Sequence, residues 1–344
     1  TISKPSLHFN TKLYTGNGSD NHAITGVGFQ PDWLWIKKRN GSTNHNLFDV
    51  VRGNSKGIQS NSNGAEYTST ETQKTFDSDG FTLGVNGQVN GNSDTFVGWN
   101  WKANGQGSSN TDGSINTTYT SVNTTAGFSI VSFTGTGSNA TVGHGLGVAP
   151  KVIITKSRAN NENWGFYHES TGNEKQLVLN NDGSLTGASS AYYNNTSPTS
   201  TVFSVGTADS TNDAANMVAY CFAEKKGYSK FGTYKGNGNT EGSFIYTGFK
   251  PAFILLKDST SVVSWTIYDD QRSSSGNNPT DKIFHPNNSN AENTADDIDI
   301  VSNGFKCRTS VAGTNKNNAT FIYMAFAAEP LVANVGQSIP ATAR

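Results

Sequence analysis

The chain has 344 residues, and 25 Lys and Arg balance 26 Asp and Glu to a formal net charge of -1. This balance provides no electrostatic reason to expect nucleic acid or an anionic membrane as a partner. No apolar stretch is long enough to span a bilayer and no signal peptide is visible, so we expect no membrane insertion. Thr1 fits either removal of an initiator methionine or cleavage of a longer precursor. Charged residues make up 15% of the chain, against about 25% in typical domains, so Asn, Ser, Thr and Gly are expected to fill the surface.

The same landmarks recur three times along the chain at equal spacing. In each copy a Gly-x-Gly turn is followed by a proline, a lysine and a polar residue, at successive intervals of 15, 6 and 12 residues. The landmarks are Gly16, Pro31, Lys37 and Asp49 in the first copy, Gly135, Pro150, Lys156 and His168 in the second, and Gly236, Pro251, Lys257 and Asp269 in the third. Three matching intervals in three copies indicate duplication of one unit.

The repeats predict three homologous domains of about 100 residues each, covering residues 1–102, 127–226 and 227–329. Residues 103–126 are rich in Gly, Ser, Asn and Thr and are predicted to be a polar linker, and residues 330–344 a C-terminal tail. Because the second and third units follow each other directly, we expect them to be tightly coupled and the first unit to be placed more independently.

Within each unit the pattern is that of β-strands. The runs that follow each proline are apolar on both faces, as expected for strands buried on both sides. In the last strand of the first unit, Val97, Trp99 and Trp101 share one face, and the mostly small residues on the other face would let a second layer or a neighbouring unit approach closely. No window has a period of 3.6 residues, so little helix is expected. The sequence therefore predicts an all-β chain of three tandem, jelly-roll-like β-sandwiches.

Two acidic groups invite comparison with calcium sites. Ser78-Asp79-Gly80-Phe81 lacks the alternating oxygen ligands of a calcium loop, and its counterpart Ser302-Asn303-Gly304-Phe305 has lost the charge, so we predict a turn that leads into a core phenylalanine. Asp296-Asp297-Ile298-Asp299 occurs in one repeat and is predicted to be a solvated loop, with adventitious Ca²⁺ binding as the alternative. Cys221 and Cys307 are predicted to be buried hydrophobic residues and not a disulfide or a metal pair.

Catalytic chemistry finds little support in the pattern. Asp269-Asp270 could be a carboxylate pair for glycoside hydrolysis, but no second carboxylate is identifiable opposite it. His168 occupies the place of Asp49 and Asp269 in the other units, which favours a structural polar position over a catalytic base. Glu66 with Glu292, and Asp49 with Asp269, are the acids that recur.

The tryptophans could stack on sugars, but their counterparts in the other repeats are Val, Ile, Phe, Leu, Tyr and Met, which favours core packing of Trp33, Trp35, Trp99 and Trp101. No catalytic, cofactor-binding or metal-binding residue is assigned, no cofactor is predicted, and ligand-binding residues stay unknown.

Five strings carry a resemblance to a known family: Leu13-Tyr14-Thr15-Gly16-Asn17-Gly18, Ile24-Thr25-Gly26-Val27-Gly28-Phe29-Gln30-Pro31, Leu47-Phe48-Asp49-Val50-Val51-Arg52-Gly53, Val142-Gly143-His144-Gly145-Leu146-Gly147 and Gly227-Tyr228-Ser229-Lys230-Phe231-Gly232. They resemble an uncharacterised tandem-repeat family of virion proteins, described loosely as tail-fibre or lectin-like, from marine bacteriophages and viral metagenomes. The resemblance covers about Phe9 to Glu329, and Asn100 stands where many copies have Cys. It implies a phage setting and assigns no functional residue.

The repeats, the uncharged surface and the resemblance together predict a structural virion protein and not an enzyme, in a tail fibre or external appendage that attaches to host cell-surface glycans through many weak contacts. Expected partners are other virion subunits, further copies of the chain in a homo-oligomer, with a trimer favoured, and host glycans. The expected location is the virion, assembled in the bacterial cytoplasm. One alternative is a purely architectural capsid decoration, collar or adaptor protein. Another is a surface-polysaccharide depolymerase, which would need paired carboxylates in a groove between units.

Overall fold

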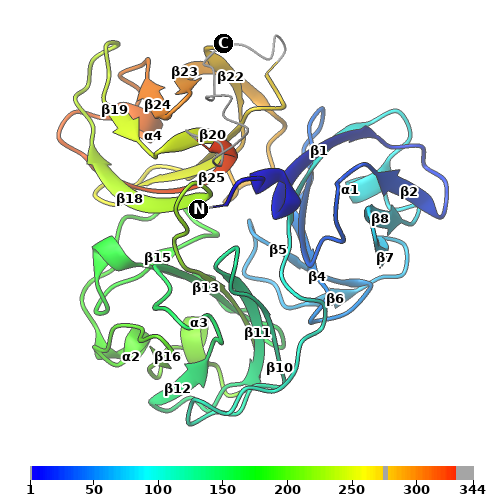
Figure 1. Ribbon diagram of the computed structural model, residues 1–344, viewed down its shortest axis with the longest axis vertical. Coiled ribbons are helices and arrows are strands. Elements are labelled where there is room, and N and C mark those ends of the chain that lie inside the picture. Colours follow the sequence, from blue (N-terminus) through cyan, green and yellow to red (C-terminus); the bar gives the residue numbers. More distant parts are fainter. Residues whose placement is uncertain (1, 274–277, 331–344) are drawn as a thin grey trace.

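Three β-sandwiches surround a common centre in the computed structural model, which describes residues 2–273 and 278–330 (Figure 1). This confirms the predicted fold, mostly antiparallel β-sheet in repeated sandwiches with little helix. Every helix within the described residues is a single turn, too short to cross a membrane.

The first unit packs a six-stranded inner sheet against a three-stranded outer sheet. In spatial order the inner sheet contains β1 (Phe9–Thr15), β9 (Thr95–Trp101), β3 (Trp33–Lys38), β4 (Asn46–Asp49), β5 (Lys56–Gln59) and β6 (Tyr67–Thr68). The outer sheet contains β2 (His22–Thr25), β8 (Gly80–Leu83) and β7 (Gln73–Asp77). The 3-10 helix η1 (Pro5–Leu7) precedes β1, and α1 (Gly87–Asn90) precedes β9.

The second unit repeats this plan with a smaller outer sheet. Its inner sheet contains β10 (Tyr119–Asn123), β11 (Phe128–Thr134), β17 (Asn216–Phe222), β13 (Val152–Ser157), β14 (Gly165–His168) and β15 (Leu177–Val178). Its outer sheet contains β12 (Ala140–Gly143) and β16 (Val202–Val205). The single-turn helices are η2 (Glu169–Thr171), α2 (Ser190–Tyr193) and α3 (Asp209–Asn212).

The third unit has two four-stranded sheets. The inner sheet contains β18 (Ser229–Lys235), β25 (Thr320–Pro330), β20 (Phe249–Asp258) and β21 (Thr266–Asp269), and the outer sheet contains β19 (Phe244–Tyr246), β24 (Gly304–Cys307), β23 (Asn293–Val301) and β22 (Thr280–Ile283). Helix α4 (Ala312–Asn315) precedes β25. Of the tail predicted at 330–344, Pro330 ends β25 and residues 331–344 lie outside the described residues.

Each unit closes on itself, because its last strand lies between the strand before the Gly-x-Gly turn and the strand at the proline. The last strands β9, β17 and β25 therefore pair with β1 and β3, with β11 and β13, and with β18 and β20. In the first unit the register places Phe9 opposite Trp101, and in the second Phe128 opposite Phe222.

Two segments differ from the sequence-based expectation. The predicted linker 103–126 includes β10, which pairs along its length with β11, and Ile115 joins the core of the second unit. An edge strand needs few apolar residues and tolerates Thr, so composition alone does not mark it. The acidic segment predicted to be a solvated loop lies within β23, where Asp297 is buried and accepts a hydrogen bond from Tyr268.

The inner sheets of all three units meet in one shared core. Trp101, Phe222 and Phe326 occupy equivalent places near its centre, with ring centroids 5.6 Å apart for Trp101 and Phe326 and 5.7 Å apart for Phe222 and Phe326. Val97 and Trp99 lie in the same core, so the units meet over the large-residue face of the last strand. Over the small-residue face it is the second layer that approaches, since Phe81 of the outer sheet lies against Gly98. The alternative of a neighbouring unit over that face is wrong, because large apolar side chains bury more area against a neighbour. The first unit is also not placed independently.

The recurring lysines are buried, and each donates hydrogen bonds to carbonyl groups of the turn that follows its strand. Lys37 Nζ donates to the carbonyl of Lys38 at 2.9 Å, Lys156 to that of Ser157 at 2.7 Å, and Lys257 to that of Asp258 at 2.8 Å. Each also donates to the carbonyl four residues ahead at 3.3 Å. Burial lowers the pKa of all three to about 8.

A second set of buried side chains, absent from the sequence-based prediction, forms hydrogen bonds to the Gly-x-Gly turns. Asn90, Asn212 and Asn315 end the helices α1, α3 and α4 and are fully buried. In each unit the side-chain oxygen accepts the N–H of the residue between the two glycines, at 2.9 to 3.0 Å. The turn and the helix are thereby tied together in all three units.

Candidate functional site

The three units contact one another along equivalent surfaces, which we call seam 1–2, seam 2–3 and seam 3–1 after the units they join. At every seam one backbone hydrogen bond of 2.9 Å occupies the same place: Glu66 N–H to the Arg158 carbonyl, Leu185 N–H to the Ser259 carbonyl, and Glu292 N–H to the Arg39 carbonyl. Because this bond recurs at each seam, the residues of the three seams can be compared position by position.

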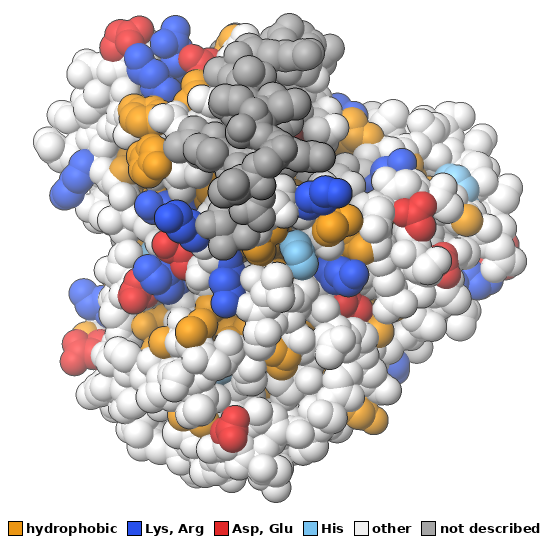
Figure 2. Space-filling model, viewed as in Figure 1, with side chains coloured by type: hydrophobic (Ala, Val, Ile, Leu, Met, Phe, Trp, Pro, Cys, Tyr) orange, Lys and Arg blue, Asp and Glu red, His pale blue; other side chains and the backbone are white. Residues whose placement is uncertain are grey.

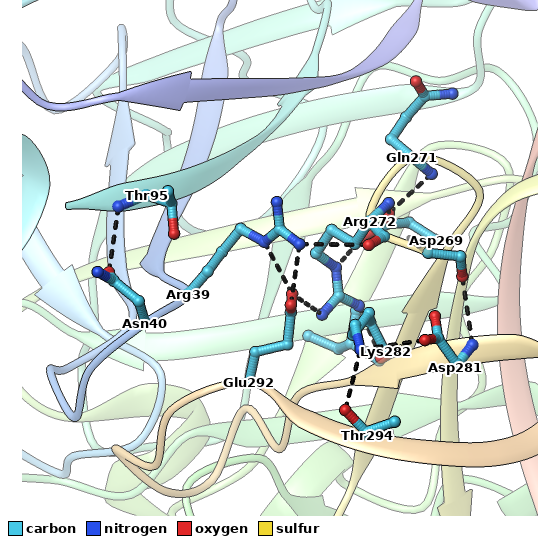
Figure 3. Close-up of polar contacts among 12 residues, drawn as sticks. Arg39, Asn40, Thr95, Asp269, Gln271, Arg272, Asp281, Lys282, Glu292 and Thr294 are labelled. Carbon is cyan, nitrogen blue, oxygen red and sulfur yellow. Dashed lines mark hydrogen bonds and ion pairs between the residues drawn. The ribbon is translucent and has the colours of Figure 1, made fainter. Parts of the chain in front are cut away.

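Seam 3–1 carries a chain of alternating charges (Figure 3). Asp269, at the end of β21, pairs with Arg272, and both side chains are fully buried. Arg272 Nη1 lies 3.2 Å from Glu292, which in turn forms two hydrogen bonds of 2.9 Å with Arg39 of the first unit. Trp99 of the first unit closes the set by donating from Nε1 to Asp269 at 2.9 Å. Buried charges need such partners, because an unpaired one is costly.

Seam 1–2 repeats the set with the units exchanged. Asp49 pairs with Arg52, Arg52 lies 3.2 Å from Glu66, and Glu66 forms hydrogen bonds of 2.9 and 3.1 Å with Arg158 of the second unit. Tyr220 of the second unit takes the role of Trp99 and donates its hydroxyl to Asp49 at 2.7 Å.

The charges at seam 1–2 shift the pKa values of its members. Burial by itself would raise the pKa of Glu66, but the hydrogen bond from Arg158 and the charge of Arg52 outweigh it, so the pKa lies below its ordinary value. Burial likewise opposes the charge of Arg52, but the Asp49 carboxylate raises the pKa of the guanidinium. Both groups therefore stay ionised at neutral pH.

Seam 2–3 contains no member of this set. The equivalent residues are His168 for the aspartate, Thr171 for its arginine, Leu185 for the glutamate, Ser259 for the second arginine and Met324 for the aromatic donor. His168 Nδ1 accepts the Ser170 N–H, and Nε2 lies 3.4 Å from the Tyr323 carbonyl. Burial lowers the pKa of His168 to about 4, so the ring is neutral. Because each buried charge depends on the others, such a set is expected to be present or absent as a whole.

A cleft of about 410 Å³ opens beside the charges of seam 3–1. It is lined by Arg39, Asn40, Thr95, Lys282, Glu292 and Thr294, which come from both units (Figure 3). Lys282 Nζ donates to Thr294 at 2.9 Å and lies 3.0 Å from Asp281. Since the cations of the cleft are matched by carboxylates, the surface presents hydrogen-bond donors and acceptors without a strong net charge.

Part of this polar set recurs at seam 1–2, where Glu66 and Arg158 correspond to Glu292 and Arg39 but Ala159 stands in place of Asn40. Lys56 Nζ donates to Thr68 at 2.7 Å, as Lys282 does to Thr294, and Thr68 follows Glu66 by two residues as Thr294 follows Glu292. In the second unit Lys175 keeps the lysine, but Gly187 stands in place of the threonine. Two of the three seams therefore carry the Lys–Thr pair together with the Glu–Arg pair.

Family comparison adds one finding. A family model described as a domain of unknown function, DUF7483, matches residues 4–330. The chain belongs to the DUF7483 family. The match spans all three sandwiches of this DUF7483 protein, and no curated protein and no solved structure matches the chain.

The acids singled out in the sequence of this DUF7483 protein serve the seams and the turns. Asp269 and Asp270 do not share a groove: Asp269 lies inside seam 3–1, whereas Asp270 lines a separate pocket of about 210 Å³, where burial raises its pKa to about 6. Asp79 accepts the N–H groups of Gly26 and Gly28 at 3.0 and 2.6 Å, and these bonds hold a loop together.

The tryptophans lie where core packing would place them. Trp33, Trp35, Trp99 and Trp101 are at most 1% exposed, which leaves no ring face for a sugar. Cys221 and Cys307 are buried free thiols. The pattern missed Arg52, Arg272, Arg39 and Arg158, although a signal existed: an arginine follows Asp49 and Asp269 by three residues, and another follows Lys37 and Lys156 by two.

Proposed function

We propose that this DUF7483 protein is a structural virion protein of a bacteriophage, part of a tail fibre or similar external appendage, that attaches to host-surface glycans through many weak contacts and catalyses no reaction. The observation that carries the proposal is the repetition, at two seams, of a Lys–Thr pair beside the same Asp–Arg–Glu–Arg set, since repeated equivalent sites suit avidity.

The chemistry of the cleft suits a polyhydroxylated ligand. Arg39 and Asn40 offer N–H donors, Glu292 offers carboxylate oxygens, and Thr95 and Thr294 offer hydroxyl groups. Sugar hydroxyl groups both donate and accept, and can bridge such neighbours. The near balance of charge in the cleft favours a neutral glycan over a phosphate-rich polymer.

The carboxylates of the seams do not support hydrolysis of the glycan. Glu66 has a lowered pKa and so carries no proton for a leaving group at neutral pH, and Asp49 and Asp269 are buried against arginines. A glycosidase needs one carboxylic acid that keeps its proton beside a second, ionised carboxylate. We therefore propose binding without turnover.

The exposed surface suits contact with a hydrated polymer. The face seen in Figure 2 consists mostly of backbone and of side chains that are neither hydrophobic nor charged. Such a surface bonds to hydroxyl groups with little dependence on salt.

The chain also supplies by itself the threefold arrangement that a homotrimer of single units would have. We propose that assembly into the virion multiplies these clefts further, with a trimer of chains as the expected form. Light scattering on the purified chain measures this directly, and a monomer at all concentrations would contradict a self-assembled trimer.

The binding experiment compares three variants on an array of bacterial surface polysaccharides. Lys282→Met with Thr294→Val removes polar groups from the cleft of seam 3–1, and Lys56→Met with Thr68→Val does the same at seam 1–2. Each pair is expected to lower affinity about tenfold, and the combination by about two orders of magnitude because avidity is lost. Lys175→Met, at the seam without the polar set, is the matched control. Equal loss with the control, or no polysaccharide bound by the wild type, refutes the proposal.

Location on the particle is tested by immunogold electron microscopy of the parent virus. Label at the tail or the fibre tips is the expected result. Label over the capsid or the neck would favour the architectural alternative, a decoration, collar or adaptor protein. One observation speaks for that alternative, because the exposed aromatic residues lie on the side of a sandwich and not at loop tips.

A further inference from the structure

The outer sheet of the third unit exposes two aromatic side chains on one short strand. Phe244 and Tyr246, in β19, are 50% and 51% exposed, while Ile245 between them is buried. Hydrophobic side chains gather over β19 in Figure 2, and Lys230 Nζ lies 5.6 Å from the centroid of the Tyr246 ring. Exposed neighbouring aromatics on a soluble surface mark an interaction site more often than scattered single residues do.

This exposure is particular to the third unit. Ile245 pairs with Phe305 as Ile24 pairs with Phe81 and Val142 with Phe203, which makes the three strands equivalent. The positions of the two aromatics are held by Ala23 and Thr25 in the first unit and by Thr141 and Gly143 in the second.

The aromatics stand on an open sheet edge. The Ser243 carbonyl accepts the Cys307 N–H, and the Thr247 N–H donates to Asn303, so the backbone at these alternate positions faces β24. The backbone groups of Phe244 and Tyr246 therefore point to the opposite side, by the alternation of an antiparallel ladder. No strand of the described residues pairs with β19 on that side.

The second unit shows what covers the equivalent edge. There the chain itself runs beside β12: the Ile115 N–H donates to the Thr141 carbonyl at 3.0 Å, and Ile115 forms a parallel bridge with Val142. Ser114 Oγ accepts the Thr141 N–H at 2.9 Å. Ile115 is 9% exposed and packs into the sandwich core. An extended segment thus satisfies the backbone of this edge and adds an apolar side chain to the core.

We propose that the open edge of β19 is the docking site for an extended polypeptide segment of another protein, which adds as a strand beside Phe244 and Tyr246. Backbone hydrogen bonds supply affinity in strand addition, and alternate side chains supply specificity. One side chain of the segment lies inward beside Ile245, as Ile115 does beside Val142, and its neighbours on either side pack on the two aromatic rings. The partner is therefore an extended segment with apolar residues on both faces. The site is separate from the polar clefts and stands or falls independently of glycan binding.

The test uses the full chain and a displayed library of random 12-residue peptides. The variant Phe244→Ala with Tyr246→Thr installs the residues of the first unit at the same positions, and peptides selected on the wild type alone are then measured against it. Selected peptides are expected to be apolar at successive positions and to bind the variant at least about tenfold more weakly. In the peptide-saturated wild type, amide hydrogen exchange of Phe244 and Tyr246 is expected to slow about tenfold or more.

Changing the peptide instead of the protein gives a test that does not depend on whether a protein variant folds. Methylating alternate backbone nitrogens of the peptide removes the donors that face β19 and is expected to abolish binding, while methylating the intervening nitrogens is not. Peptides that bind the variant equally, or that leave the exchange of both amides unchanged, overturn the proposal. So does self-association of the wild type that the variant abolishes, which would assign the edge to a second copy, or polysaccharide binding that the variant abolishes.

Discussion

Tyr220 of the second unit donates its hydroxyl to Asp49 of the first unit across 2.7 Å, inside a seam where both side chains are fully buried. Asp49 also holds Arg52, so one carboxylate links its own unit and its neighbour. Trp99 and Asp269 repeat the relationship at the next seam. The packing of the three units around their common centre therefore depends on hydrogen bonds to buried charges as well as on the aromatic core.

Tyr220→Phe removes only the donor of that bond and leaves the ring in place. Because the acceptor is a buried charge, we expect the free energy of unfolding to fall by about 1.5–3 kcal/mol. Denaturant unfolding measures the change. Tyr228→Phe is the matched control, since the Tyr228 hydroxyl is buried without a hydrogen-bond partner and its removal should cost little. Equal losses in the two variants would show that the Asp49 contact contributes nothing.

Asp269→Asn leaves the buried guanidinium of Arg272 without its closest counter-ion. Breaking one partner of a buried ion pair is expected to lower the free energy of unfolding by about 3–5 kcal/mol. Thermal and denaturant unfolding provide the measurement, and the neighbouring Asp270→Asn is expected to change stability in the opposite direction. A loss below about 1 kcal/mol would mean that the Glu292 carboxylate alone is enough to stabilise the buried charge of Arg272.

Asp270→Asn is expected to raise the free energy of unfolding at neutral pH and to leave it unchanged at acidic pH. Burial raises the pKa of Asp270 to about 6, above its ordinary value of 3.8. A raised carboxyl pKa means that the stability present below pH 3.8 is lost as the pH rises through 6. The neutral amide avoids that loss, so the variant should be more stable than the wild type by about 1–3 kcal/mol at pH 7.5 and equal to it near pH 4. A pH series of unfolding curves in which the two proteins run parallel would contradict this.

His168→Asn tests the neutral histidine of seam 2–3. The pKa of His168 is lowered from 6.5 to about 4, so its contribution to stability is present above pH 6.5 and is lost as the pH falls toward 4. Between pH 7 and pH 4 the wild type should lose up to about 3 kcal/mol more than the variant. Titration of the ring by NMR checks the same quantity, and a pKa near 6.5 in the folded chain would refute the expectation.

Asn315→Ala removes the side chain that ties the third Gly-x-Gly turn to α4. Its amide donates to Asn237, Asn239 and Thr309 at 2.8 Å each, and these partners lose their donor together. We expect a loss of at least about 2 kcal/mol in the free energy of unfolding. Asn317→Ala, two residues ahead and exposed, is the control and should change stability by less than about 0.5 kcal/mol. A loss in Asn317→Ala as large as in Asn315→Ala would assign the effect to the turn in general.

Much of the fold could be predicted because it is local. The spacing from Gly16 to Asp49 recurs in each unit, a run that is apolar on both faces marks β3, and large residues at every second position mark β9. Two strands were missed where that signal is weak: the edge strand β10 consists largely of polar residues, and the inner strand β23 contains Asp297 and Asp299. A strand at an edge is held mainly by backbone hydrogen bonds, which leave no apolar pattern.

The recurrence of Glu66 with Glu292, and of Asp49 with Asp269, was visible in the sequence, but their role was not. Asp49 meets Tyr220 across 171 residues, and Asp269 meets Trp99 across 170. Periodicity describes neighbours within one strand or hairpin and carries no information on such distant pairs.

The sequence by itself determined three tandem β-units, the burial of their tryptophans and the positions of their turns, because strand period, turn residues and repeat spacing act over a few residues. Only the tertiary structure decided that the three units close around one aromatic core, that two seams carry a complete set of charges and one carries none of that set, and that Phe244 and Tyr246 lie on the open sheet edge of β19. These features arise where surfaces of distant segments meet, and the free energy of that contact depends on which side chains face each other across the seam.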